Sequence, residues 1–471
     1  MPDRPLRREI AQTLGLAVPI VGAQLAQMSM SFVDVVMVGR LGTSALAAAV
    51  LGSTTFFTLS LVCIGIIMAV NPTVSQAMGA GDRDEAARAA RQGLWLALLL
   101  GVPLTIALGW AEEGLLLVGQ APETAALAGD YLGAIRWGFV FNLAFAAFRG
   151  FYEGIGRARP VLLATVVGVG VNIAANDVLM YGRWGLPALG LEGTGWSSAL
   201  VMVTMTASLA IGLRVSPHLR SFGVLTGLRR PDPSMLLALV RLGVPIGATL
   251  GLEAGLFSVG TLLVGLFGET ALASHQIALN AASFTFMVPL GIGMASTVRV
   301  GTFIGAGDEA GARRAGFVAI GLGGAFMAFA ALFLWLRPQW IVAIYAGTTP
   351  DPEMAALAAS LLGIAAVFQI VDGVQATASG ALRGLKDTRV PMLIGAVSYW
   401  GIGMGTGATL AFGMGLGSRG LWWGLTAGLA AAAVLLVLRF VRRTHPSRAL
   451  AAAASGGGAG GEREPLSFRS E

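Results

Sequence analysis

Residues 243–268 read GVPIGATLGLEAGLFSVGTLLVGLFG, and residues 17–42 read AVPIVGAQLAQMSMSFVDVVMVGRLG. The two stretches align without a gap at a spacing of 226 residues, and the agreement continues to residues 315 and 89. The matching positions include Val38-Gly39 with Val264-Gly265, Gly42 with Gly268, Ala45-Leu46-Ala47 with Ala271-Leu272-Ala273, Gly79-Ala80-Gly81-Asp82 with Gly305-Ala306-Gly307-Asp308, and Arg88-Ala89 with Arg314-Ala315. Chance does not hold one register over about seventy residues, so the chain contains an internal repeat.

The composition is typical of an integral membrane protein. Hydrophobic residues make up 55% of the chain and charged residues 12%, and the mean hydropathy is +0.75. Twelve apolar runs are near the ~20 residues that a helix needs to cross ~30 Å of hydrocarbon. They lie at 13–37, 46–70, 93–111, 127–148, 161–181, 195–214, 236–266, 270–297, 314–336, 355–382, 391–413 and 420–441. The runs lack the strict alternation of β-barrel strands, so the sequence predicts an all-α polytopic membrane protein.

The basic residues predict the orientation of these helices. Nearly all of them lie before the first run, after the last run or in alternate loops, which the positive-inside rule places in the cytoplasm together with both termini. The net charge of +6 therefore does not indicate nucleic-acid binding. Six helices in each half give both halves the same orientation, so the repeats are parallel. The predicted parts are a cytoplasmic head (1–12), a six-helix bundle (13–213), a cytoplasmic linker (214–235), a second six-helix bundle (236–443) and a disordered cytoplasmic tail (444–471).

Two Gly-Ala-Gly-Asp loops resemble phosphate-binding loops only superficially. They lack the Lys-Ser/Thr pair of a P-loop, and no strand precedes them. Asp82 and Asp308 are instead predicted to cap the Ala- and Arg-rich helices that follow. A second repeat signal, at a spacing of 230, matches Glu153-Gly154 and Arg159 with Arg383-Gly384 and Arg389.

Two acidic residues of the second half are predicted to lie deep in the membrane. Glu253 follows the cytoplasmic Arg241 by twelve residues, which is roughly 18 Å at ~1.5 Å per residue. Asp372 precedes the cytoplasmic Arg383 by eleven residues, which is roughly 16 Å. The two acids are therefore at similar height and could share one cavity. A carboxylate at mid-bilayer costs ~3 kcal/mol or more, so such groups usually have a function, although a buried packing role stays the alternative.

The first half carries its acid at a different depth. Asp34 lies six residues before Arg40 and Asn176 lies seven before Arg183, so both are roughly 10 Å below the outer face. They could share a cavity, with Asn172 one turn from Asn176. The alternative for the two asparagines is hydrogen bonding between packed helices, for which amides are commonly used in membranes.

Several other residues are weaker candidates. Gln27 occupies the position in the first half that Glu253 holds in the second. Asp177 is expected to face Arg183 or the outer water. Pro19 and Pro245 interrupt the hydrogen-bond ladders of their helices, and each is either a moving part or an ordinary membrane proline.

Apolar side chains of one predicted helix could form an adaptable wall for a ligand, or could simply face the core or the lipid. These are Phe284, Phe286, Met287 and Met294. Three scattered histidines and a single cysteine make no metal site, and no catalytic triad, Asp-rich motif or nucleotide loop indicates an enzyme.

Taken together, the motifs resemble those of the multidrug and toxic compound extrusion (MATE) family, in its NorM-like branch, over about residues 10–443. They are Pro19 with Phe32-Val33-Asp34 and Gly39, Gly79-x-Gly81-Asp82, Asn172-x-x-x-Asn176, Pro245 with Glu253, His275-Gln276-Ile277-Ala278, Arg299-Val300-Gly301, and Asp372-Gly373-Val374-Gln375 running into Leu382-Arg383-Gly384-x-Lys386-Asp387. Asp177 and Met30 depart from the pattern, since an apolar residue is usual at the first position and some relatives have tyrosine at the second.

The resemblance implies two six-helix bundles around a central cleft that works by alternating access. It implies export of organic, often cationic compounds by antiport with Na⁺ or H⁺ across a bacterial inner membrane. Glu253 and Asp372 match the cation site of the second lobe, where Na⁺ could bind, and Asp34, Asn172 and Asn176 match the network of the first. We expect a monomer without a cofactor.

Three alternatives stay open at this point. A lipid-linked oligosaccharide flippase of the same superfamily shares the twelve-helix plan but is expected to have a strongly basic cleft. A membrane prenyl transferase would need clustered metal-binding acids. An ion channel would need a pore-lining motif.

Overall fold

The computed structural model describes residues 3–228, 230–346 and 351–445, and every regular element within these ranges is a helix. The first half comprises α1 (Asp3–Gly39), α2 (Thr43–Ile67), α3 (Val70–Gly79), α4 (Arg83–Ala107), η1 (Leu108–Trp110), α5 (Ala111–Leu117), α6 (Pro122–Ile135), η2 (Arg136–Gly138), α7 (Phe139–Gly154), α8 (Arg159–Tyr181) and α9 (Gly190–Val215). After α10 (Pro217–Arg220), the second half comprises α11 (Pro233–Gly265), α12 (Glu269–Gly305), α13 (Glu309–Leu336), α14 (Pro338–Ala346), α15 (Pro352–Gly384), α16 (Arg389–Gly395), η3 (Ala396–Met404), α17 (Gly405–Ala408), η4 (Thr409–Gly413) and α18 (Gly417–Arg443).

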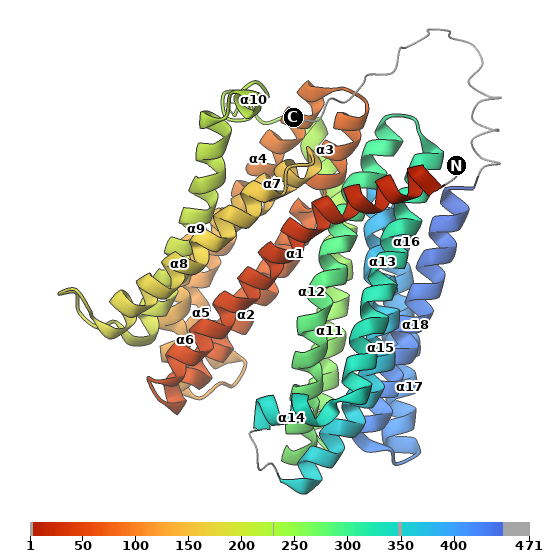
Figure 1. Cartoon of the computed structure of the whole chain (residues 1–471). Coiled ribbons are helices and arrows are strands. Elements are labelled where there is room, and N and C mark those ends of the chain that lie inside the picture. The colour runs from red at the N-terminus through yellow and green to blue at the C-terminus, as the bar shows by residue number, and fades with distance from the viewer. Residues whose placement is uncertain (1–2, 229, 347–350, 446–471) are drawn as a thin grey trace.

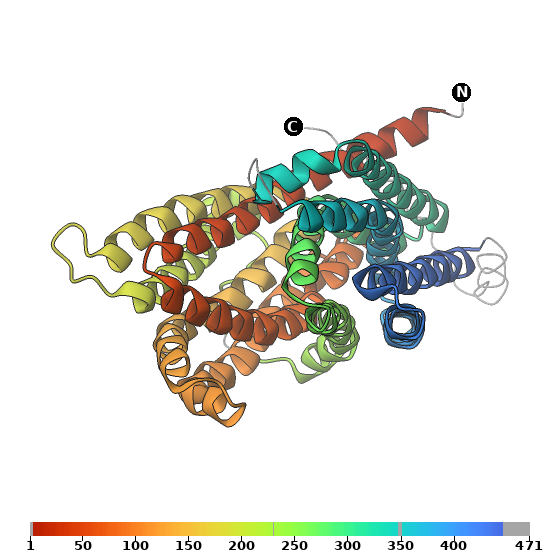
Figure 2. The same cartoon turned by 90° about the horizontal axis from the view of Figure 1, so that it is seen from below.

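The halves lie side by side, as both views show (Figures 1 and 2). Helix α1 begins and α18 ends at the same end of the molecule, which we call the terminal end. Eleven helical segments of the described chain are long and apolar enough to cross a membrane. The chain is thus a multi-pass membrane protein, as predicted. The predicted tail falls almost wholly on residues 446–471, outside the described ranges, and α1 continues through most of the predicted head.

The eleventh predicted run, 391–413, is helical throughout but not uniformly wound. It forms α16, η3, α17 and η4, and η3 and η4 are π-helical. Its glycines lie against α18 so closely that a Cβ added to Gly428 would be 2.7 Å from the Cα of Gly403. Because the winding changes along it, this run is not counted among the eleven, although its position completes the twelve-helix plan.

The internal repeat is visible in the backbone. Gly42 and Gly268 precede α2 and α12 with φ of 112° and 98°, and Gly81 and Gly307 have φ of 78° and 76°. These left-handed conformations are open to glycine at little cost and explain why the repeat preserves glycine there. At the second repeat spacing, Gly156 (φ 78°) corresponds to Lys386, which keeps the conformation (φ 55°) without being glycine.

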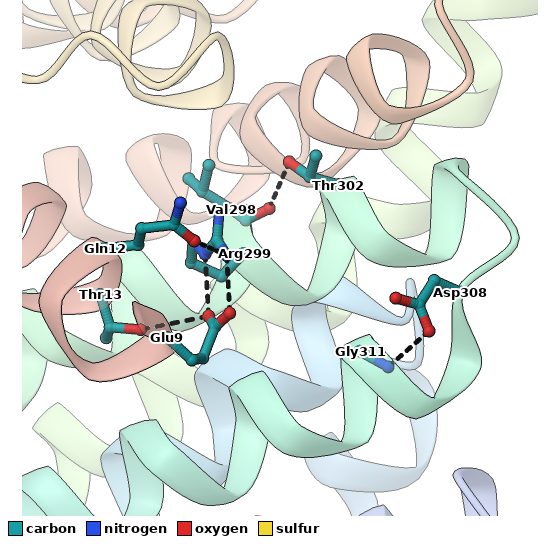
Figure 3. A network of polar contacts seen from close by, with 8 residues as sticks. All are labelled: Glu9, Gln12, Thr13, Val298, Arg299, Thr302, Asp308 and Gly311. Carbon is teal, nitrogen blue, oxygen red and sulfur yellow. Dashed lines mark hydrogen bonds and ion pairs between the residues drawn. The ribbon is translucent and has the colours of Figure 1, made fainter. Parts of the chain in front are cut away.

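The repeated aspartates cap helices, as predicted. A carboxylate oxygen of Asp82 accepts a hydrogen bond from the Glu85 amide at 2.8 Å, and Asp308 accepts one from the Gly311 amide at 2.7 Å (Figure 3). Each bond satisfies one of the amide groups that a helix leaves unpaired at its start.

Removing either cap should therefore destabilise the fold. We expect Asp82→Ala and Asp308→Ala each to lower the free energy of unfolding by about 1 kcal/mol, and the asparagine variants to lower it by less. The single cysteine, Cys63, is 6% exposed, so a thiol-reactive dye added during heating in detergent reports unfolding. Equal melting temperatures for the alanine variants and the wild type would contradict the capping role.

The halves pack against each other near the terminal end, where α2 and α3 of the first half lie against α11 and α12 of the second. The side-chain amide of Gln76 donates to the carbonyl of Gly384 at 2.8 Å. A Cβ added to Gly243 or Gly305 would collide with a carbonyl oxygen of the other half. Small residues allow this approach, which accounts for part of the unusual glycine content.

Helix α1 adds an ion pair between the halves (Figure 3). Both carboxylate oxygens of Glu9 accept from the guanidinium of Arg299 on α12, at 2.9 and 2.7 Å, and Gln12 accepts from it at 2.7 Å. Glu9 is only 3% exposed. The two parallel bonds of this pair and its burial make it a strong link between α1 and the second half.

We expect Glu9→Gln to loosen this end because it leaves the Arg299 guanidinium without its ionic partner. Ser75, which is fully buried beside Gly301, is a suitable site for a reporter cysteine. Maleimide labelling of Ser75→Cys should be several-fold faster with Glu9→Gln than without it. The matched control is Arg8→Gln, which removes an exposed charge from the same helix; equal labelling rates in all three backgrounds would refute the link.

Candidate functional site

A cavity of about 400 Å³ lies mainly among helices of the second half, and we call it the acidic cavity. Helices α11, α12 and α15 each contribute one stripe of side chains at helical spacing. Its wall consists of Ile246, Thr249, Leu250, Glu253, Ala254, Phe257, Leu279, Ala282, Ser283, Phe286, Met287, Leu290, Phe368, Asp372, Gln375, Ala376, Ser379 and Arg383, with Phe57 and Leu61 of α2 and Thr388 and Pro391 near α16. The spacing of three and four residues explains how three helices converge on one space.

Glu253 and Asp372 both line this cavity, so the structure brings together the two acids that were placed at similar depth from the sequence. Asp372 is 5% exposed, and its Oδ1 has no hydrogen-bond partner among the described residues. In the same ranges, neither carboxylate has a lysine, arginine or histidine nitrogen within 4 Å. Both acids therefore face the cavity without a resident ionic partner.

Local structure holds the acidic cavity in shape. Pro245 lies inside α11, and the Thr249 hydroxyl donates to its carbonyl oxygen at 2.8 Å, in the turn that follows the proline. Gln375, one turn after Asp372, donates to the hydroxyl of Tyr399 at 2.6 Å.

The sequence alone assigned no role at the site to Gln375, Tyr399 or Arg383. Gln375 and Arg383 could have been found by stepping from Asp372 by three and eleven residues, which returns to the same helix face. Of the proposed apolar wall, Phe286 and Met287 line the acidic cavity, whereas Phe284 is 57% exposed.

Asp34 forms a separate network in the first half. Its Oδ1 accepts from the side-chain amides of Asn172 at 2.9 Å and Asn176 at 2.6 Å. The asparagines are 2% and 0% exposed and stand one turn apart on α8, so both amides reach the same oxygen. The three residues that the sequence predicted to share a cavity are thus in direct contact.

The remaining candidates lie elsewhere. Asp177 forms an ion pair with Arg183 at 3.1 Å, which is one of its two predicted surroundings. Gln27 belongs to neither acid site and lines a second cavity between the halves. Pro19 is buried inside α1, where that helix packs on α12.

Comparison with known proteins identifies the family. A model of the family described as MatE matches residues 19–178 and 245–409, which is most of both halves. This chain belongs to the MATE family. The family consists of transporters and not of enzymes, as the sequence indicated.

Two of the relatives by sequence are named NorM. The chain is 46% identical over 443 residues to a protein of Burkholderia vietnamiensis named multidrug resistance protein NorM, covering 93% of this chain and 95% of that protein. It is 43% identical over 440 residues to a probable multidrug resistance protein NorM of Pseudomonas aeruginosa, covering 93% and 90%.

Solved MATE structures share the fold. A structure titled as the outward-facing conformation of a multidrug resistance MATE transporter has a TM-score of 0.84 at 21% identity, with 93% of this chain and 96% of that chain covered. The eukaryotic MATE transporter AtDTX14 gives 0.82 at 20% identity, with 94% and 99% covered. The acidic cavity with Glu253 and Asp372 thus lies in a helical fold that is shared with solved MATE transporters.

The Asp34 network predicts a contrast between two substitutions. Asp34→Asn keeps an oxygen for the two buried amides, so we expect little change in melting temperature. Asp34→Leu leaves Asn172 and Asn176 without that acceptor, and each unsatisfied group costs about 1–3 kcal/mol. Melting followed with the Cys63 dye should therefore separate the two variants; an equal loss of stability in both would contradict the hydrogen-bonding arrangement.

Proposed function

We propose that this chain is a multidrug efflux transporter of the bacterial inner membrane, exporting organic, often cationic compounds by antiport with Na⁺ or H⁺. The observation that carries the proposal is the acidic cavity, where Glu253 and Asp372 face a mostly apolar space of about 400 Å³ and have no basic partner within 4 Å among the residues that the structure describes. Apolar walls with a few polar groups are typical of sites for small organic ligands. The names of the NorM relatives support the same function.

The acids are proposed as the point of exchange. An ionised carboxylate in such a cavity is costly, and a bound cation relieves that cost. An organic cation and the coupling ion can each do so, and only one of them is needed at a time. A membrane potential near 100 mV adds ~2.3 kcal/mol for each charge that moves inward, which is enough to bias the exchange.

Alternating access is proposed to act through the contacts at the terminal end. Gln76–Gly384 and Glu9–Arg299 join the halves there, so opening the cleft at that end requires these bonds to break. By the distribution of arginine, the terminal end faces the cytoplasm. The contacts then hold the substrate path closed on the cytoplasmic side. The flippase alternative is less well supported, because the larger cavity carries two acids and one arginine.

We expect Glu253→Gln and Asp372→Asn each to reduce ion-driven transport of ethidium at least about tenfold, because each removes a charge that the exchange uses. Transport is measured as uptake into everted vesicles under a Na⁺ or an H⁺ gradient, imposed one at a time. The matched control is Glu113→Gln, which neutralises an exposed acid of α5.

Wild-type rates in either cavity variant would overturn the exchange scheme. Wild-type protein that moves no dye under either gradient would overturn the proposed function itself. Melting temperatures close to that of the wild type establish that the variants are folded.

A further inference from the structure

A second cavity of about 200 Å³ lies between the halves, and we call it the inter-half cavity. Most of its wall comes from α1, α3 and α7 of the first half, and Met294, Thr297 and Arg383 come from the second. Arg383 lines both this cavity and the acidic cavity. One guanidinium therefore stands where the two spaces meet.

Arg149, the first arginine of the inter-half cavity, has strong acceptors for only some of its hydrogen-bond donors. Arg149 donates from Nε to Glu153 at 2.7 Å, while its Nη2 donates to the thioether sulfur of Met294 at 3.0 Å. A thioether is a weak acceptor, and guanidinium groups ordinarily pair with oxygen. Arg149 thus turns one of its strong donors toward the cavity wall without a matching acceptor.

Arg383 is satisfied even less. Within the described residues, its one side-chain hydrogen bond goes from Nη2 to Ser379 at 3.3 Å, and no carboxylate lies within 4 Å of its nitrogens. Two other partly buried arginines have an acidic partner, whereas Arg136 and Arg314, also partly buried, have no carboxylate within 4 Å in the described residues. Arg299 pairs with Glu9 and Arg439 with Asp387. Glu253 and Asp372 share the acidic cavity with Arg383 but lie more than 4 Å from its nitrogens, so no carboxylate is in contact with this guanidinium.

The charges of the inter-half cavity do not balance. Glu153 is its one lining carboxylate, and both oxygens are already used, by Arg149 and by the side-chain amide of Asn71 at 3.1 Å. The wall of this cavity alone therefore has two guanidinium groups and one carboxylate, while Glu253 and Asp372 lie on the other side of Arg383, in the acidic cavity. The nearby side chains of Gln27 and Asn142 can add neutral hydrogen-bond donors.

We propose that Arg149 and Arg383 form an anion-binding subsite that takes a single carboxylate-sized anion. The forked N–H groups of arginine match two oxygens of a carboxylate. The anion has two conceivable sources. It is a free small anion such as acetate or chloride, or it is the carboxylate of a substrate whose amine lies toward Glu253 and Asp372 across Arg383. The second source rests on the proposed function, and the first does not.

The first arm of the test measures binding of small anions to the purified full-length chain. Acetate or chloride should raise the melting temperature of the wild type relative to an equal concentration of the bulky sulfonate MES. The rise should be absent in Arg383→Gln. Arg389→Gln, which neutralises an exposed arginine at the start of α16, is the matched control and should keep it.

The second arm compares tetramethylrhodamine, which carries a free carboxylate and a cationic dye system, with its methyl ester, which is only cationic. Fluorescence anisotropy gives the affinities. Arg383→Gln should weaken binding of the acid about tenfold or more and leave the ester nearly unchanged. Arg149 is bonded to the fully buried Glu153, so Arg149→Lys, which keeps the positive charge, is used in place of a neutral variant. This variant should keep the fold and should bind the acid form of the dye more weakly than the wild type does.

The outcomes separate the sources. Loss of the acetate or chloride effect with unchanged dye affinities assigns the subsite to a free anion, and selective loss of the acid dye assigns it to the substrate. The subsite is refuted if neither arginine variant changes any of these readouts, or if wild-type protein responds to neither anion and binds acid and ester alike. Failure of the proposed function is seen differently, as binding without ion-driven transport in vesicles.

Discussion

The cost of an uncompensated charge inside hydrocarbon governs the interior of this protein. Away from the cavities the chain pairs buried charges within the fold, as in Glu9 with Arg299 and Asp387 with Arg439. Around the acidic cavity it does not, and Glu253, Asp372 and Arg383 have no ionic partner within 4 Å in the described residues. The contrast between the two groups locates the working parts more clearly than burial alone.

The scaffold around these charges depends on close approach of backbones. Glycines at the junction of the halves leave no room for a side chain, and those at the junction of η3 and α17 with α18 do the same. Lipid provides little hydrophobic force between helices, so packing and hydrogen bonds have to hold them. A junction built on such contacts is either formed or broken, which suits the opening proposed at the terminal end.

Much of the scaffold could be predicted from the sequence, because duplicated turns need the same backbone conformations in both halves. The glycines at 42, 81, 268 and 307 and the caps at Asp82 and Asp308 follow from that requirement. The depth count placed Glu253 and Asp372 together because helix rise is nearly constant. The position of Arg383 in the cavity wall was harder to predict from the sequence, because an arginine near a helix end usually indicates membrane orientation. The π-helical winding of 396–404 was not foreseen, because it depends on contact with α18.

Helix α1 belongs to the first half by sequence, yet its opening turns are bonded to α12 of the second. The duplication therefore did not leave two self-sufficient modules. A fragment that began after the polar connector would lack the carboxylate to which its own Arg299 is bonded, while the complementary fragment would keep Glu9 with no guanidinium to hold. Each half contains one partner of the Glu9–Arg299 ion pair, so re-forming this pair would favour reassociation of co-expressed fragments.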